Sequence, residues 1–198
     1  MKKQILRILA LTVAMFTVFS LCACSQSTPF KRGTQEGNVY KSEFLSLTFE
    51  KPEDWAFYTD AEIAEVTGRA AEVLDDEGFE KEVEGSIIDF YAAGQSGDSV
   101  NLTFSKGTAF TDLDKSIEAS IDEVKSQYAS LGWTVEVGEE KDAKLGANTF
   151  KGYGIKVAAD GLEMMQYMYF AKTGKYVECL ACTSVSGMSQ ADFEAMFS

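Results

Sequence analysis

The chain has 198 residues, of which 45% are hydrophobic, and its formal net charge is −13. This length allows one domain with a sizeable core. The excess of acid argues against nucleic-acid binding, because a nucleic-acid partner requires lysine and arginine clustered along a phosphate track.

The first 24 residues have the pattern of a bacterial lipoprotein signal. A basic start is followed by an apolar stretch from Ile8 to Leu21 and then by Leu-Cys-Ala-Cys, ending at Cys24. The apolar stretch is shorter than the ~20 residues of a spanning helix. We expect residues 1–23 to be a cleaved signal peptide and Cys24 to carry a diacylglyceryl group, whose two acyl chains anchor the protein outside the cell membrane. Ordinary secretory cleavage and a retained anchor are the alternatives.

Residues 24–38 show no hydrophobic periodicity and predict a flexible, acylated tether with a mean reach of roughly 20 Å. Residues 39–198 are predicted to form a single globular domain. Residues 1–23 hold three basic residues and no acidic ones, so the rest of the chain carries −16. We expect this charge to keep the domain soluble and held off an anionic envelope. A basic partner or a loosely bound cation is the alternative.

The alternation of apolar and polar residues, with glycine-bearing turns between them, predicts eight strands. Their order with the helices is two strands, helix, two strands, helix, four strands, helix. The short turns between the last three strands favour antiparallel neighbours. The strands are expected at residues 44–49, 55–58, 86–93, 99–105, 133–137, 150–158, 162–171 and 176–183.

Three helices have readable starts. The first begins at Thr59, which is followed after three residues by a glutamate and so predicts a capping box. The second covers residues 113–131 with a continuous apolar stripe, and Thr111 or Asp112 caps it. A short third helix follows Ser189.

The acidic segment 75–85 was compared with the calcium loop of an EF-hand. With Gly78 at the sixth position of that loop, acids fall at the third, fifth and twelfth positions. The first position is then Val73, which has no ligand atom. Histidine, the commonest metal ligand and general base, is absent from the chain. We therefore expect a solvated acidic loop, no metal site, no cofactor and no histidine-based triad.

Two cysteines, Cys179 and Cys182, fall within a predicted strand. Side chains alternate between the two faces of a strand, so residues three apart point to opposite sides. A disulfide between them would need a break in that strand. No helix begins there, as a thioredoxin-type motif would require. We expect two buried apolar side chains, with a labile disulfide or a redox pair as alternatives.

Large, soft side chains gather on the strand predicted at residues 162–171, which contains three methionines and three aromatic residues between 164 and 170. Methionine and tyrosine are frequent on adaptable binding surfaces. The candidate binding surface consists of Tyr153, Tyr167, Tyr169 and Tyr176. The alternative is a central strand covered on both sides by helices.

The order of elements, together with the stretches Gly37–Tyr40, Glu43–Phe49 and Pro52–Trp55, resembles uncharacterised bacterial lipoproteins of the PsbP-like α/β/α sandwich superfamily. The resemblance implies an α+β fold with a mainly antiparallel sheet flanked by helices, and it implies docking or small-molecule binding. It carries over no catalytic residues. Metal-binding positions of the photosystem members include histidine, so a photosynthetic role does not transfer, and a shared fold does not establish function.

These observations predict a lipid-anchored, extracytoplasmic protein that acts as a non-enzymatic binding or interaction module. Its expected partners are the membrane, through the lipid on Cys24, and a protein or small molecule. One alternative is an envelope enzyme that uses carboxylates or the Cys179/Cys182 pair. A purely structural assembly factor is a third possibility, which the sequence does not separate from the first.

Overall fold

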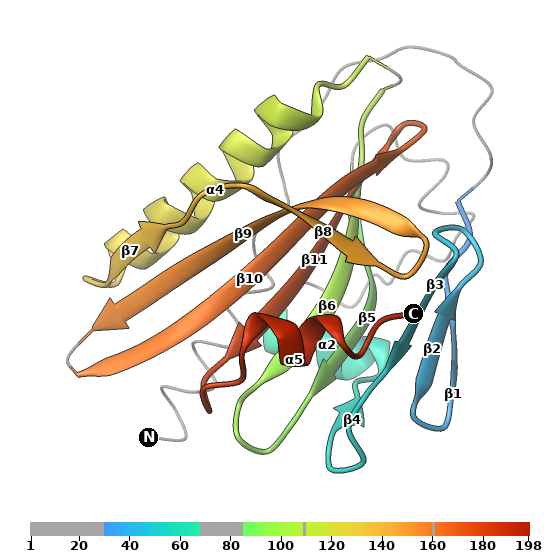
Figure 1. Ribbon diagram of the computed structural model, residues 1–198, viewed down its shortest axis with the longest axis horizontal. Helices are drawn as coiled ribbons and strands as arrows, with labels where there is room; N and C mark the ends of the chain where they lie inside the picture. Colours follow the sequence, from blue (N-terminus) through green and yellow to red (C-terminus); the bar gives the residue numbers. More distant parts are fainter. Residues whose placement is uncertain (1–29, 68–84, 109, 160) are drawn as a thin grey trace.

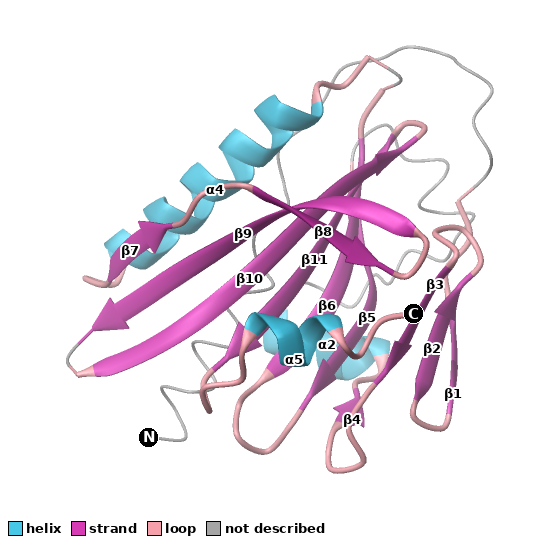
Figure 2. Cartoon of the chain, in the orientation of Figure 1, coloured by secondary structure: helices cyan, strands magenta, loops and turns pink. Residues whose placement is uncertain are grey.

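The computed structural model describes residues 30–67, 85–108, 110–159 and 161–198. The predicted signal peptide, Cys24 and the acidic segment up to residue 84 lie outside these residues. Within the described part, the chain forms two antiparallel sheets and three helices (Figures 1 and 2). Among these residues, no helix combines the length and the apolar character that a membrane crossing needs.

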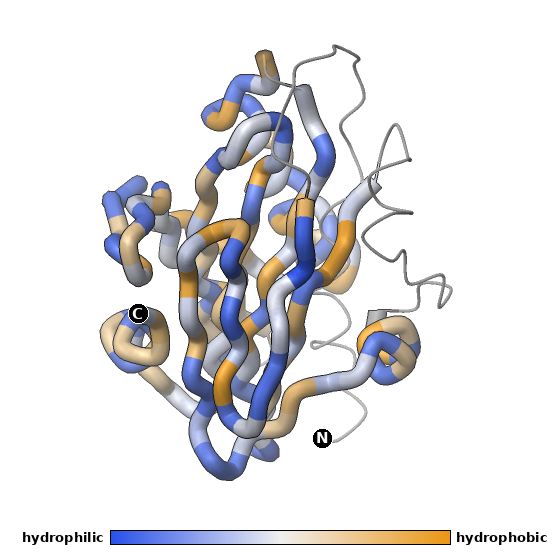
Figure 3. The backbone as a smooth tube through the Cα atoms, turned by 90° about the vertical axis from the view of Figure 1, so that its right-hand side faces the viewer, coloured by the Kyte–Doolittle hydropathy of each residue, from blue (hydrophilic) through white to orange (hydrophobic). Residues whose placement is uncertain are grey.

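The larger sheet has eight strands in the order β4-β5-β6-β11-β10-β9-β7, and β8 pairs with β9. Each of its ladders is antiparallel. The strands are β4 (Ala56–Phe57), β5 (Ser86–Ala93), β6 (Ser99–Lys106), β7 (Thr134–Val137), β8 (Lys141–Leu145), β9 (Asn148–Ala159), β10 (Leu162–Thr173) and β11 (Tyr176–Ser184). Hydrophobic and hydrophilic residues alternate along many of them, as the tube in Figure 3 shows.

The smaller sheet has three strands in the order β1-β2-β3. A bridge between Phe49 and Phe197 ties the end of the chain to this sheet. Its strands are β1 (Thr34–Glu36), β2 (Val39–Ser42) and β3 (Leu47–Glu50).

The helices begin at the caps that the sequence predicts. Asp112 caps α4 (Leu113–Ser130) by accepting hydrogen bonds from two main-chain N–H groups, and Ser189 forms a capping box at α5 (Gln190–Glu194). The third helix, α2 (Asp60–Thr67), starts after Thr59, which exchanges hydrogen bonds with Glu62. Each cap satisfies N–H groups that have no partner inside the helix.

The large sheet separates two cores. The small sheet and α5 cover one face, where Phe49, Phe90 and Phe193 are fully buried. The other face is covered by α4 over β9, β10 and β11, and by α2 over β5. Figure 3 shows α5 and α2 on opposite sides of the molecule. The prediction of an α+β fold, with a mainly antiparallel sheet flanked by helices, is therefore confirmed.

The folded part begins earlier than predicted. Phe30, expected in the tether, is 3% exposed and packs against Phe104 with 4.8 Å between ring centroids. Arg32 donates two hydrogen bonds to Asp60. Strand β1 follows within the residues assigned to the tether. Isolated apolar and basic residues carry no periodic signal, so the boundary at residue 39 was wrong by about nine positions.

Candidate functional site

Strands β9 and β10 stop pairing and separate at one end of the large sheet. Their ladder runs from the Leu162–Ala159 pair to the Phe170–Lys151 pair and ends there. Beyond it, residues 148–150 of β9 continue to pair with β8, and residues 171–173 of β10 continue to pair with β11. The two strands thus face each other across a gap in the sheet, without pairing with one another.

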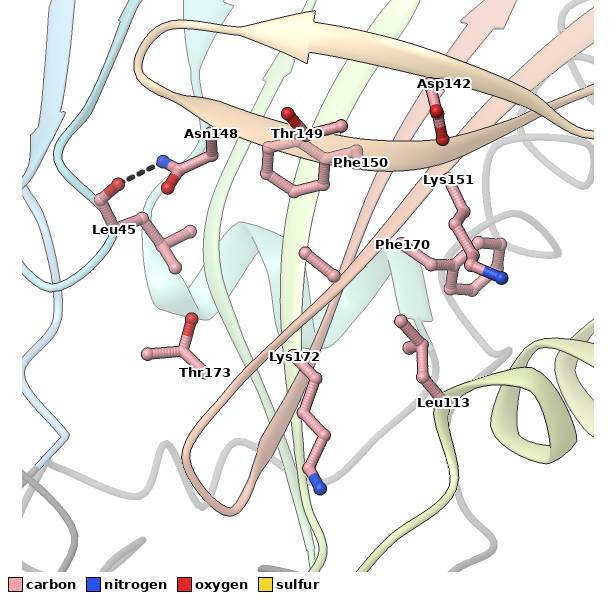
Figure 4. Close-up of a pocket in the computed structure, with 11 residues that line it drawn as sticks. Leu45, Leu113, Asp142, Asn148, Thr149, Phe150, Lys151, Phe170, Lys172 and Thr173 are labelled. Carbon is pink, nitrogen blue, oxygen red and sulfur yellow. Dashed lines mark hydrogen bonds between the residues drawn. The ribbon is translucent and has the colours of Figure 1, made fainter.

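This gap is a cleft with a volume of about 380 Å³ (Figure 4). The loop that contains Leu45 borders one side, where Asn148 donates a side-chain hydrogen bond to the Leu45 carbonyl. The first residue of α4, Leu113, borders the other. The wall consists of apolar and polar residues in similar share: Leu45, Leu113, Asp142, Asn148, Thr149, Phe150, Lys151, Phe170, Ala171, Lys172 and Thr173.

Two lysines give the cleft its positive groups. Lys151 lies between two carboxylates, with its Nζ atom 2.6 Å from Asp114 and 3.3 Å from Glu140. Hydrogen bonds to these two acids raise the pKa of the Lys151 ammonium above its usual range. Lys172 donates to the Thr111 carbonyl at 2.8 Å. Both cations are held in place by their partners, and the two acids beside Lys151 offset its charge, so the cleft carries groups of both signs.

A buried carboxyl lies directly behind the cleft. Glu178 on β11 pairs with Ala171, whose small side chain lines the cleft, and Glu178 is 0% exposed. Its two carboxylate oxygens have no hydrogen-bond partner of ordinary geometry among the described residues. Burial raises the pKa of the Glu178 carboxyl to about 7, although nearby Thr173 and Lys172 oppose the shift. Glu178 could not be recognised from the sequence, because one acid within an apolar strand shows no periodic signal.

The four tyrosines of the predicted binding surface do not come together. Tyr153 packs on the α4 side of the sheet, where it donates to Glu140, whereas the other three lie on the opposite face. Tyr169 and Tyr176 are fully buried there. Tyr167 is half-buried, with its ring 5.9 Å from that of a phenylalanine in α5. The four tyrosines therefore do not form the predicted groove. They are divided between the two faces of the sheet, and the chain's own elements cover both faces.

The two cysteines are free and fully buried, and they belong to different cores, as the strand alternation predicted. Cys179 faces α4, and Cys182 faces the small sheet and α5. Burial raises the pKa of both thiols well above the usual range. A reactive thiol needs a lowered pKa and access to solvent, so this environment gives no support to redox chemistry.

We expect both thiols to resist alkylation in the native protein and to react fully after denaturation. A maleimide reagent and intact-mass measurement, with and without guanidinium chloride, would show this. Rapid labelling of Cys179 or Cys182 before the loss of tertiary circular dichroism would contradict the buried positions described here.

A row of buried polar side chains, which no sequence pattern indicated, crosses the α4 side of the sheet. These side chains are neutral hydroxyls and amides whose donors or acceptors have no partner among the described residues. Each such group costs about 1–3 kcal/mol if it stays unsatisfied, so we expect ordered water to bridge them. They are Tyr91, Ser99, Asn101, Ser105, Tyr128, Gln166 and Thr183.

Within the described residues, no group of three cysteine, aspartate or glutamate side chains is placed to hold a metal ion. The part of the acidic segment that was compared with a calcium loop lies outside the described residues. At the cleft, the arrangement offers apolar contacts, two cations and the main chain of two parted strands. These features are suited to binding.

No protein-family model matches this chain. No curated protein matches it either. Among solved structures, cyanobacterial PsbP (CyanoP) from Synechocystis is 9% identical, with a TM-score of 0.49, over 90% of this chain and 98% of that one. LpqN of Mycobacterium tuberculosis, which is described as involved in cell envelope biogenesis, is 11% identical, with a TM-score of 0.37, over 77% of this chain and 82% of its own.

A Bacteroides thetaiotaomicron protein is 13% identical, with a TM-score of 0.45, over 83% of this chain. This chain spans about half of that protein, 48% of its length. A PsbP protein is thus among the structural neighbours. Because all three TM-scores lie below 0.5, no activity or partner is transferred from these proteins.

Proposed function

We propose that this protein is a lipid-anchored, extracytoplasmic binding module that takes a short, extended peptide segment into the cleft between β9 and β10 and catalyses no reaction. The observation that carries the proposal is the parting of these two strands beyond the Phe170–Lys151 pair. The location outside the membrane rests on the lipoprotein pattern that ends at Cys24.

An extended segment fits the gap for a physical reason. Proteins often recognise such a segment by adding it to an open strand edge, where main-chain hydrogen bonds supply affinity and side-chain pockets supply specificity. Here residues 148–150 and 171–173 supply an edge on each side. The partly exposed Leu113 and Ala171 offer apolar contacts, and polar side chains of both signs line the rest of the wall.

The alternative, an envelope enzyme, has support from one residue. A carboxyl with a pKa of about 7, as in Glu178, is matched to general acid–base work near neutral pH. However, a general acid has to come within hydrogen-bond reach of its substrate, and Glu178 is 0% exposed. The buried thiols give no second candidate. Binding is therefore the function that the cleft supports best.

Photo-crosslinking in the native host tests the proposal. A benzophenone amino acid replaces Thr149, an exposed residue that lines the cleft, and in a parallel strain it replaces Thr134, an exposed residue of β7 at the far end of the sheet. We expect an adduct of reproducible mass at position 149 and none at position 134. Adding Ala171→Phe, which fills the cleft, should abolish the adduct.

Equal crosslinking at the two positions, or no adduct at position 149, would contradict a ligand in the cleft. Persistence of the adduct with the Ala171→Phe change would place the partner on the outer surface.

A further inference from the structure

One phenylalanine is exposed to solvent at the end of the sheet where α4 begins. Phe110 is 85% exposed, although apolar side chains of this size are usually buried. Its loop is braced from within. The Phe110 N–H donates to Thr108 Oγ1 at 3.1 Å, and the Thr108 N–H donates to Thr111 Oγ1 at 2.6 Å. The exposed ring thus projects from a main chain that is held by two threonine hydroxyls.

Two lysines flank this loop. Lys172 is the next-to-last residue of β10, and Lys175 lies in the turn that leads to β11. Lys172 donates to the Thr111 carbonyl at 2.8 Å, and the Lys175 carbonyl accepts a hydrogen bond from Gly107 N–H at 2.7 Å. A Cβ atom at Gly107 would lie 2.5 Å from Thr111 Oγ1, so a glycine is required for this close approach. The exposed ring and the two cations thus belong to one braced surface.

The described chain also begins at this end of the sheet. The ring of Phe30 lies 5.6 Å from that of Tyr176, the residue that follows Lys175. Figure 1 shows the start of the described chain, the β10–β11 turn and the start of α4 all toward the upper end of the view. Six peptide steps separate Phe30 from Cys24, and at 3.3–3.6 Å per residue they reach at most about 22 Å. A lipid on Cys24 would bring this end close to the bilayer.

We propose that this end of the domain, with Phe110 and Lys175 at its surface, docks on the surface of the membrane that holds the lipid anchor. The inference rests on the lipid of the proposed function. The aromatic ring lies at the boundary between headgroups and acyl chains, as amphipathic membrane-surface elements do, and the Lys175 ammonium contacts anionic headgroups, while Lys172 stays bound to the Thr111 carbonyl. The large negative charge of the chain opposes any broader contact with the same surface.

Depth-dependent quenching tests this orientation. The mature lipoprotein carries Phe110→Cys or Leu131→Cys, labelled with an environment-sensitive thiol dye, in phosphatidylglycerol vesicles that contain brominated lipids. Leu131 is 50% exposed and follows the 18-residue α4, about 27 Å from its start, so it is the matched control. Unchanged protein, whose two domain cysteines are buried, gives the background labelling. We expect quenching at position 110 to exceed that at position 131 several-fold.

Two further measurements distinguish a failure of the lipid anchor from a failure of the docking. Intact mass that lacks a diacylglyceryl group overturns the anchor and the docking together, whereas a lipidated protein with equal quenching at both positions overturns the docking alone. Lys175→Gln should reduce quenching at position 110 in phosphatidylglycerol vesicles, and Lys125→Gln, on the exposed face of α4, should leave it unchanged. Equal effects of the two lysine variants would overturn the headgroup contact.

Discussion

Replacing Asp89 with alanine is expected to lower the free energy of unfolding by about 3–5 kcal/mol, because it removes one member of a buried ionic network. The Asp89 side chain is 0% exposed and lies 3.5 Å from the guanidinium of Arg32. It accepts hydrogen bonds from the Tyr40 hydroxyl at 2.5 Å and from the Gly33 N–H at 3.1 Å. Alanine would leave three donors without their acceptor.

Urea denaturation, followed by tryptophan fluorescence, measures this loss as a shift in midpoint with an unchanged m-value. The control is Asp60→Ala. Asp60 also pairs with Arg32, at 2.9 Å, but its side chain is 42% exposed, so we expect a loss of about 1 kcal/mol or less. Similar losses for the two variants would contradict the central role assigned to Asp89.

Replacing Glu178 with glutamine is expected to change how stability depends on pH. The free energy of unfolding of the variant, measured relative to that of the unchanged protein, should be higher at pH 8 than at pH 4 by up to about 3 kcal/mol. The pKa of this carboxyl rises from 4.5 to about 7 on folding. Between these values the unfolded chain has lost the proton and the folded chain has kept it, so the stability of the unchanged protein falls as pH rises through this window. Glutamine carries no such proton.

Thermal or urea unfolding at several values between pH 4 and pH 8 would follow the effect. Because the chain is strongly acidic, its stability depends on pH for other reasons as well, so the relevant quantity is the difference between variant and parent. Glu136→Gln, at an exposed position of β7, controls for the change in net charge. A parallel pH dependence in Glu178→Gln and in the parent would rule out Glu178 as the cause.

The elements that were predicted well have strong local signals. Helix α4 has a continuous apolar stripe, a capping aspartate at Asp112 and a left-handed glycine at Gly132. The last three long strands are joined by short turns. Strands β1, β2 and β8 were missed. Strand β1 is exposed throughout, and β2 and β8 contain only two buried residues each, Tyr40 and Ser42 in β2 and Ala143 and Leu145 in β8.

The candidate site was not predicted, because it depends on contacts between distant residues. The cleft exists only because the β9–β10 ladder stops at Lys151, and no local pattern marks that point. Asp89 is similar. It lies where the pairing of β5 with β6 shifts by one residue, so the bulge turns a carboxylate toward Tyr40 in the middle of a strand. The predicted grouping of tyrosines was wrong, because Tyr153 belongs to the opposite face from the other three.

The position of Arg32 has a mechanical consequence. Any tension that reaches the globule through its amino-terminal chain meets this residue two positions after Phe30. Its guanidinium is tied to Asp60 and to the carbonyls of Ile88 and Asp89, so the force passes directly to β5 inside the large sheet. Pulling would then shear this joint before it could peel the outer hairpin of β1 and β2. A protein held at a surface by its first residues would gain resistance to being stretched open.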